Sequence, residues 1–122
     1  MHLKIVKRLA KQYLEKCKEV YGDSNHHECT PYIEYQPYVY SVYCEDDNPE
    51  AEYIFDYNTI VVYYKNIEDA EHLARTIVHE YQHYLQSPSW MTRYYNMGYH
   101  YSDHPYEVAA FAEEENWRKV AW

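Results

Sequence analysis

Apolar residues recur with helical spacing in two long segments of the chain. The first segment spans residues 2–21, and Gly22 follows it as a stop signal. Its apolar stripe consists of Leu3, Val6, Ala10, Tyr13, Cys17 and Val20. The other positions are rich in Lys and Arg, as is typical of the solvent-facing side of an amphipathic helix. The pattern therefore predicts an N-terminal helix whose apolar side covers a sheet.

The second segment predicts a helix from about Ile67 to Gln86. Asn66 is a suitable N-cap, and acidic residues occupy the first turn, where the helix dipole favours them. The apolar positions that repeat every four residues are Leu73, Ile77, Tyr81 and Leu85. The turn-forming residues that predict the end of this helix are Ser87, Pro88 and Ser89.

The chain between these helices favours extended structure. Residues 31–44 are rich in aromatic and β-branched side chains, but Pro31 and Pro37 have no amide donor, so an edge strand or a bulged pair fits best. Residues 45–50 predict a loop. The hairpin predicted next has strands at Tyr53–Phe55 and Ile60–Tyr64, with a turn at Asp56–Asn58.

The C-terminal third predicts an aromatic connection over residues 90–102 and then a last helix. Ser102 or Asp103 would cap this helix, and Pro105 would lie in its first turn. Together the elements predict one α+β domain over residues 1–122. We expect the N-terminal helix to pack on a small, mostly antiparallel sheet, with the central helix and the C-terminal helix completing the domain.

Composition and charge narrow the function classes. The formal net charge is −9, and clustered cations are absent, which argues against nucleic-acid binding. No apolar run approaches the length of a membrane span, and the charged N-terminus is unlike a secretory signal. We therefore expect a cytoplasmic protein without a nucleic-acid or membrane partner. The 18 tyrosines predict many rings at the boundary between core and water.

Three cysteines, Cys17, Cys29 and Cys44, form no C-x-x-C pair. Reduced thiols are the simplest interpretation of an odd number of unpaired cysteines. His26, His27 and Cys29 offer a soft-metal alternative, but no second half-site accompanies them.

Stronger candidate chemistry lies within the second helix, where His79 and His83 stand four residues apart with Glu80 between them. Positions i and i+4 of a helix point the same way, so both imidazoles can bind one metal ion. Glu80 lies about 100° around the helix, near enough to accept a proton from a water at the metal. With eight histidines in the chain the pattern can arise by coincidence, but it falls in phase on an amphipathic helix.

A catalytic zinc needs a third protein ligand and an open fourth position. We favour Glu107, in the first turn of the last helix; His100, Asp103 and His104 remain alternatives, and His104 fits a capping or supporting role better. One of the acidic residues at 113–115 could orient a ligand histidine. Candidate donors to an oxyanion are Arg93, Tyr94, Tyr95, Tyr99, Tyr101 and Tyr106, and the sequence does not choose among them.

With H-E-x-x-H at 79–83 and an acidic residue on a later helix, the chain resembles the zincin metallopeptidases, and within them the gluzincins. "ARTIVHEYQHYLQ" followed by "HPYEVAAFAEE" is most similar to compact ImmA/IrrE-like peptidases and to small metallopeptidases of phage genomes. The resemblance implies zinc bound by His79, His83 and Glu107, with Glu80 as the base. Gluzincins often have polar residues just after the third ligand, whereas residues 108–112 are apolar here.

The resemblance thus implies a zinc-dependent peptidase that acts on a protein or peptide substrate. The substrate would add as an extra strand beside residues 60–64, which would border the cleft. Two alternatives stay open. One is a metal-binding protein without turnover, and the other is an interaction module whose tyrosine-rich surface binds a partner.

Overall fold

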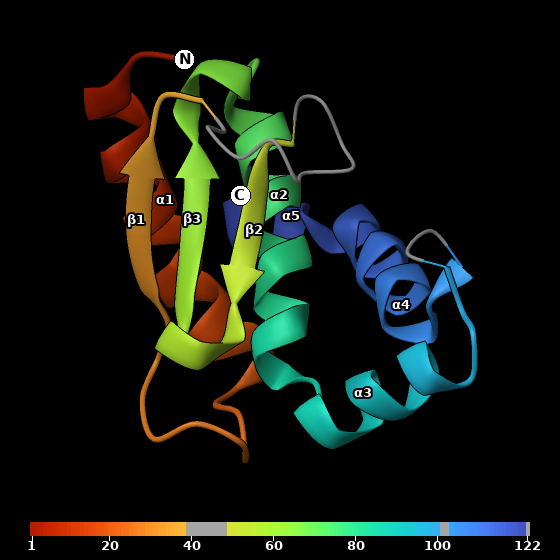
Figure 1. Cartoon of the computed structure of the whole chain (residues 1–122). Coiled ribbons are helices and arrows are strands. Elements are labelled where there is room, and N and C mark those ends of the chain that lie inside the picture. The colour runs from red at the N-terminus through yellow and green to blue at the C-terminus, as the bar shows by residue number, and fades with distance from the viewer. Residues whose placement is uncertain (39–48, 101–102, 122) are drawn as a thin grey trace.

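The protein is an α+β structure in which helices cover one face of a small sheet (Figure 1). The computed structural model describes residues 1–38, 49–100 and 103–121. Its α-helices are α1 (Leu3–Tyr21), α2 (Ala70–Leu85), α3 (Pro88–Asn96), α4 (Pro105–Glu113) and α5 (Arg118–Ala121). Its strands are β1 (Tyr32–Gln36), β2 (Ala51–Ile54) and β3 (Thr59–Tyr63).

Helix α1 confirms the first predicted helix. His2 caps it by accepting a hydrogen bond from the Lys4 amide, and Gly22 ends it at a φ of 80°, a conformation that favours glycine. The buried positions are Val6, Ala10, Tyr13 and Cys17, all from the predicted stripe. They contribute to one core together with residues of α2 and the sheet.

The sheet has the order β1-β3-β2. Strands β2 and β3 form the predicted antiparallel hairpin, but Phe55 belongs to a short 3-10 turn, and Asn58 closes the turn in the left-handed conformation. Strand β1 lies at an edge, as predicted, and pairs with β3 in parallel. The sheet is therefore mixed, with one parallel and one antiparallel pair, and the expectation of a mostly antiparallel sheet was wrong.

Strand β3 takes the central position because it is apolar on both faces. Its residues from Ile60 to Tyr63 are all buried, which is typical of a strand covered on two sides. Both edges of β3 are hydrogen-bonded, so no further strand can be added to it. The expected substrate position beside residues 60–64 is therefore wrong, and β2 is the edge strand that packs beside α2.

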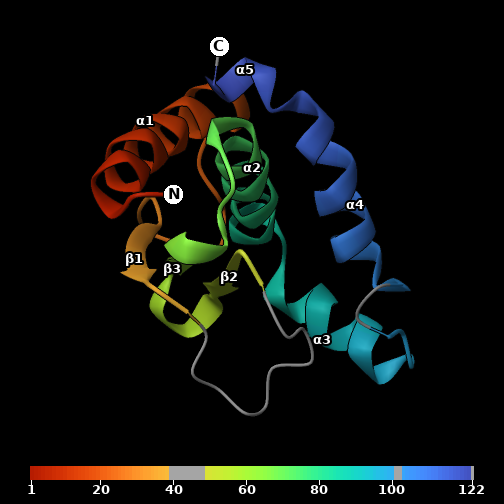
Figure 2. The ribbon, with the colours of Figure 1, turned by 90° about the horizontal axis from the view of Figure 1, so that it is seen from above.

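Helix α2 begins at Ala70, three residues later than the predicted start at about Ile67. Asp69, rather than Asn66, caps it by accepting a hydrogen bond from the His72 amide. The Asn66 side chain instead donates to the carbonyl of Pro49, and Tyr64–Asn66 form a 3-10 turn. The helix lies between α1 and α4 (Figure 2), so it is the element that most of the molecule packs around.

The segment after α2 differs from its prediction. Ser87 and Pro88 end α2 but also begin α3, with Ser87 as the N-cap and Pro88 in the first turn. The predicted connection over 90–102 is therefore mostly helical. Because Pro is favoured in the first turn of a helix, the same residues that end one helix can start another.

Helix α4 starts with Pro105 in its first turn, as predicted, but its N-cap is His104. Asp103 does not cap it, and Ser102 lies outside the described residues. The helix is also shorter than a single C-terminal helix, because a 3-10 turn at Glu114–Asn116 separates it from α5.

Candidate metal centre

Helix α2 carries His79 and Glu80, which are buried, and His83, which is partly buried. The rings of His79 and His83 lie side by side, with centroids 5.1 Å apart. Leu73, Ile77 and Tyr81 are fully buried on the core side of the same helix and fix its position. The two imidazoles are therefore held by a rigid element, as a metal site requires.

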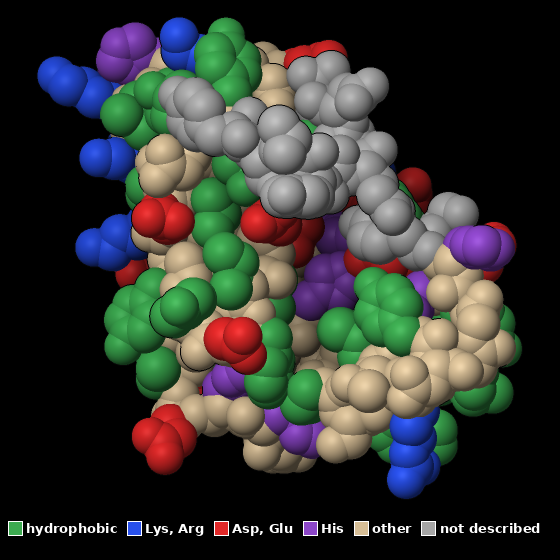
Figure 3. All heavy atoms as spheres, in the orientation of Figure 1, with side chains coloured by type: hydrophobic (Ala, Val, Ile, Leu, Met, Phe, Trp, Pro, Cys, Tyr) green, Lys and Arg blue, Asp and Glu red, His purple; other side chains and the backbone are tan. Residues whose placement is uncertain are grey.

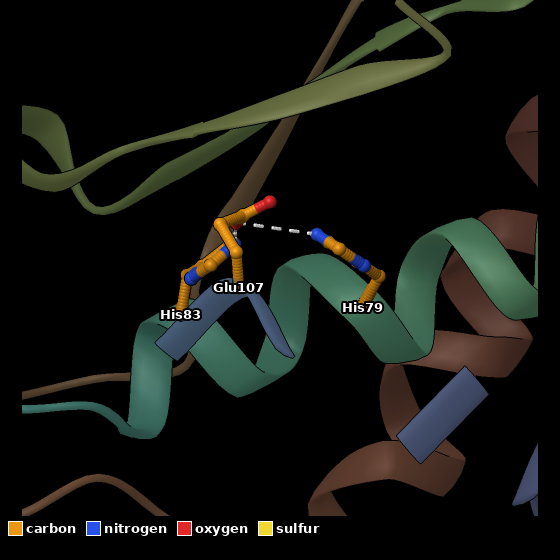
Figure 4. Close-up of side chains that lie close together, drawn as sticks. All are labelled: His79, His83 and Glu107. Atoms are coloured by element: carbon orange, nitrogen blue, oxygen red, sulfur yellow. Dashed lines mark ion pairs between the residues drawn. The ribbon is translucent and has the colours of Figure 1, made fainter. Parts of the chain in front are cut away.

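Glu107 enters the same site from the first turn of α4. Its Oε1 is 3.4 Å from His79 Nε2 and also contacts His83 Nε2. Figure 4 shows the carboxylate of Glu107 reaching between the two imidazoles. One potential ligand atom from each of the three residues lies within 4.8 Å of the others. The structure thus brings together the three residues that the sequence proposed as ligands.

The other candidates for the third ligand lie elsewhere. Within the described part of the chain, His79, His83 and Glu107 are the one group of this kind, and His100, Asp103 and His104 do not join it. The His104 ring is buried and accepts a hydrogen bond from the Tyr106 amide at Nδ1, while its Nε2 lies 3.3 Å from the carbonyl of Met91. His104 therefore links α3 to the start of α4.

Each of the two histidines has a second partner at its outer nitrogen. His79 Nδ1 lies 2.9 Å from Glu114 Oε2, and His83 Nδ1 lies 2.7 Å from Gln86 Oε1. Since these oxygens accept hydrogen bonds, each Nδ1 carries the proton, and each Nε2 points to Glu107. Gln86 also donates to the carbonyl of Tyr106, which ties α2 to α4.

Glu114 supplies the acidic partner that the apolar residues 108–112 cannot supply. The carboxylate that orients His79 comes seven residues after Glu107, from the 3-10 turn after α4. Phe111 occupies the intervening helical turn and packs its ring against that of His79, with centroids 4.6 Å apart. The sequence indicated an acidic residue at 113–115 for this role, but it did not indicate the role of Gln86.

The electrostatics of the cluster favour a cation. Burial lowers the pKa of His79, but hydrogen bonds to Glu107 and Glu114 and the charge of Glu80 outweigh burial and raise it to about 10. Burial raises the pKa of Glu107, yet the two histidines outweigh it and hold this pKa well below its usual range. In the metal-free protein, the proton on His79 therefore supplies positive charge that the carboxylates attract.

One atom of the cluster has no partner. Glu107 Oε2 is buried and accepts no hydrogen bond from any described residue. A buried carboxylate oxygen is costly unless it is paired, so this atom is suited to a ligand or a metal ion. The donor set of two imidazoles and one carboxylate fits zinc.

Glu80 is 7% exposed and adjoins the cluster. Burial raises its pKa; the charges of His83 and His79 oppose this effect, and those of Glu107 and Glu52 add to it. General bases are commonly buried carboxylates with a raised pKa beside other polar groups, so Glu80 is suited to this role.

The candidate oxyanion donors lie mainly in a separate aromatic group. Tyr94 contacts Tyr99, His104 and Tyr106, and Tyr95 also contacts His104. Arg93 stacks on the ring of Trp90, 4.8 Å from its centroid. Tyr101 lies outside the described residues. Among the described residues, no hydrogen bond joins the side chain of one of these donors to His79, His83 or Glu107.

The soft-metal hypothesis for His26, His27 and Cys29 finds no support among the described residues, because these side chains do not form a ligand group. His27 instead stacks on Tyr84 and makes a 3.0 Å hydrogen bond with the Tyr53 hydroxyl. Cys17 and Cys29 are free thiols, and Cys44 lies outside the described residues.

The space-filling view shows a hollow between the sheet and the side formed by α3 and α4, with histidine side chains visible inside it (Figure 3).

In the described part of the chain, no helix has the length and apolarity needed to cross a bilayer. Compared with models of protein families, with curated proteins and with solved structures, the chain shows no match.

Proposed function

We propose that the protein is a zinc-dependent peptidase of the zincin type, close in organisation to the gluzincins. The observation that carries this proposal is the meeting of His79, His83 and Glu107, whose ligand atoms lie within 4.8 Å of one another. The outer partners of both histidines and the buried Glu80 support it.

Zinc held by three protein ligands keeps a fourth position for water, lowers the pKa of that water to about 7 and polarises a carbonyl oxygen. His79 and His83 would supply Nε2, because their Nδ1 atoms are engaged by Glu114 and Gln86. Glu107 would supply a carboxylate oxygen, and the unpartnered Oε2 is one such oxygen.

Glu80 would act as the general base. It would take a proton from the attacking water and return it to the leaving amide nitrogen as the peptide bond breaks. Its raised pKa makes it a better proton acceptor than an exposed carboxylate. A protein or peptide segment would bind in extended form beside β2, which pairs only with β3 among the described residues.

A closed structural metal site is the main alternative, and the geometry speaks against it. Structural zinc sites are closed by four protein ligands. In the described residues the cluster has three members, His79, His83 and Glu107. An interaction module that has lost its metal would not need both histidines oriented by outer partners.

The test compares the wild type with Glu80→Gln and His83→Ala. Zinc content is measured by elemental analysis, and cleavage of a proteome-derived peptide mixture is measured by mass spectrometry. We expect one zinc per chain in the wild type and in Glu80→Gln, and about 100-fold or greater loss of cleavage in Glu80→Gln. His83→Ala should lose both zinc and cleavage. Glu115→Gln, an exposed change next to Glu114, is the matched control.

Two results would overturn the proposal. One is a wild-type protein that holds zinc but cleaves no more peptide bonds than Glu80→Gln does. The other is zinc content that His83→Ala leaves unchanged.

A further inference from the structure

The described residues expose their large apolar side chains unevenly. Twelve such side chains are exposed, and half of them belong to the short stretch from residue 90 to residue 111. They are Trp90, Tyr95, Met97, Tyr99, Val108 and Phe111. Exposed apolar side chains that gather in this way commonly mark a binding surface.

Helix α3 lies at the margin of the molecule, away from α1 and β1, in both ribbon views (Figures 1 and 2). It has no buried residue, so the exposed rings do not serve the core. They are nevertheless held in place, because Trp90 contacts Tyr94, and Tyr94 contacts both Tyr99 and Tyr106. We call these four residues the aromatic wall.

The aromatic wall continues into the candidate metal centre. Tyr106 directly precedes Glu107, and its carbonyl accepts the hydrogen bond from Gln86, which holds His83. On the next turn of α4, Phe111 packs against the ring of His79 while remaining about half exposed. A chain lying along this side would therefore run from the wall to the ligand atoms.

The low charge of residues 88–111 indicates which kind of partner this surface would bind. Between residues 88 and 111 the formal charges are Arg93, Asp103 and the buried Glu107, whereas the whole chain carries −9. The wall is thus an almost uncharged surface on an acidic protein. It matches an extended peptide with apolar side chains, since burial of those side chains against rings is favourable without charge pairing.

We infer that the aromatic wall binds apolar or aromatic side chains of the peptide substrate next to the bond that is cleaved. The inference rests on the proposed peptidase function and assigns its substrate class: extended, weakly charged segments rich in large apolar residues. Folded proteins bury such segments, so the substrates would be unfolded chains or exposed apolar termini.

The test measures binding rather than cleavage, so that it does not depend on turnover. The zinc-loaded Glu80→Gln protein is titrated into two fluorescent peptides of zero net charge. One peptide carries several Phe and Leu residues, and in the other these residues are replaced by Ser. Binding is followed by fluorescence anisotropy in three proteins: Glu80→Gln alone, with Trp90→Gln/Tyr99→Gln, and with Ile5→Gln/Val20→Gln.

The two double variants are matched. Trp90 and Tyr99 are 47% and 40% exposed, and Ile5 and Val20, on α1, are 42% and 41% exposed. Tyr94 and Tyr106 stay in place, so α3 and α4 keep their ring contact. We expect the apolar peptide to bind about tenfold more tightly than the Ser peptide, Trp90→Gln/Tyr99→Gln to lose about that factor, and the α1 variant to keep it.

Equal binding of the two peptides, or the same affinity in both double variants, would overturn the inference. So would a wild-type dimer in light scattering that Trp90→Gln/Tyr99→Gln converts to a monomer, because a second copy would then cover the wall. Recruitment to zwitterionic lipid vesicles that depends on Trp90 and Tyr99 would assign the wall to a membrane surface instead. If binding follows the expectation but no Glu80-dependent cleavage exists, the proposed function fails while the binding surface stands.

Discussion

The two histidines of the cluster have chemically different partners at Nδ1. His79 is held by a carboxylate, Glu114, and His83 by a neutral amide, Gln86. A carboxylate partner raises the basicity of an imidazole more than an amide does, because it stabilises developing positive charge. Glu114 should therefore raise the metal affinity more than Gln86 does.

This difference leads to a prediction for Glu114→Gln. The amide retains a hydrogen-bonding oxygen but removes the charge, so the zinc affinity should fall by about 10-fold, towards 100-fold for Glu114→Ala. Competition with a chromophoric chelator measures the affinity. Glu115→Gln changes an exposed carboxylate bound to Arg75 and should leave the affinity unchanged. Equal effects of Glu114→Gln and Glu115→Gln would mean that only the overall charge matters.

Metal binding should also release protons. The pKa of His79 is raised to about 10, so this ring is protonated near neutral pH in the metal-free protein, and, against the opposing effect of burial, hydrogen bonding to Glu107 also raises the pKa of His83. A histidine must lose its extra proton to bind a metal, whereas a carboxylate binds in its ionised form, and Glu107 is already ionised because its pKa is lowered. Zinc binding at about pH 7.5 should therefore release protons, about one of them from His79, and affinity should fall as the pH falls.

Calorimetric titration with zinc in two buffers of different ionisation enthalpy measures this number. His79→Gln removes the protonated ring and should lower the proton release as well as the affinity. A release close to zero in the wild type would contradict the charge distribution described for the cluster.

At the level of elements, the spacing of apolar residues predicted the helix and its buried face, which local sequence determines. The stripe Leu73, Ile77, Tyr81 identified α2 and placed His79 and His83 beside the core, because a helical face is set by spacing alone. The cap signals and Pro105 at the start of the last helix predicted Glu107 in its first turn, and the structure confirms that position. The contact between α2 and α4 is a tertiary feature, and the structure supplies it.

Other features of the fold could not be predicted from local sequence patterns. The parallel pairing of β1 with β3 depends on a register between distant segments, which no local pattern encodes. Ser87 and Pro88 were interpreted only as an end, although the same residues are strong helix starters. Ser102 or Asp103 was preferred as the cap of α4 because Ser and Asp are the commoner caps, whereas the structure confirms the capping role that the sequence also allowed His104.

His104 allows a prediction that separates a cap from a ligand. In His104→Asn the side chain can still accept from the Tyr106 amide, so α4 and Glu107 should stay in place and zinc affinity should change little. His104→Ala removes the cap and the contact to Met91, and should cost about 1 kcal/mol of folding free energy and weaken zinc binding. Chemical denaturation and chelator competition measure the two quantities.

If His104 were instead a metal ligand, as the sequence left open, Asn and Ala would abolish zinc binding equally. Rescue by Asn therefore distinguishes the two roles without a need for activity.

At the level of the whole molecule, the core and the candidate centre are separate. The core joins α1, α2, the sheet and Val120 of α5, and none of its members is a cluster residue. Helix α4, in contrast, contributes only Ala110 and Glu107 to the buried interior. The protein should therefore fold without metal, and the metal should mainly fasten α4 to α2.

Zinc should accordingly raise thermal stability without being required for folding. At a free zinc concentration 100 times the dissociation constant, binding should contribute about 2.7 kcal/mol and raise Tm by roughly 10 °C. Differential scanning fluorimetry with a zinc buffer and with EDTA measures the shift, and His83→Ala should show almost none. A chain that is unfolded in EDTA would indicate a structural zinc site instead.

The position of the ion itself is the most direct test of the account. A crystal of the zinc-loaded protein, measured with X-rays on both sides of the zinc absorption edge, gives an anomalous map in which zinc is unambiguous. We expect one strong peak bonded to His79 Nε2, His83 Nε2 and a carboxylate oxygen of Glu107, with Glu80 next to the remaining open side. A peak held by other residues, a fourth protein ligand that closes the site, or no peak between the two histidines would contradict it.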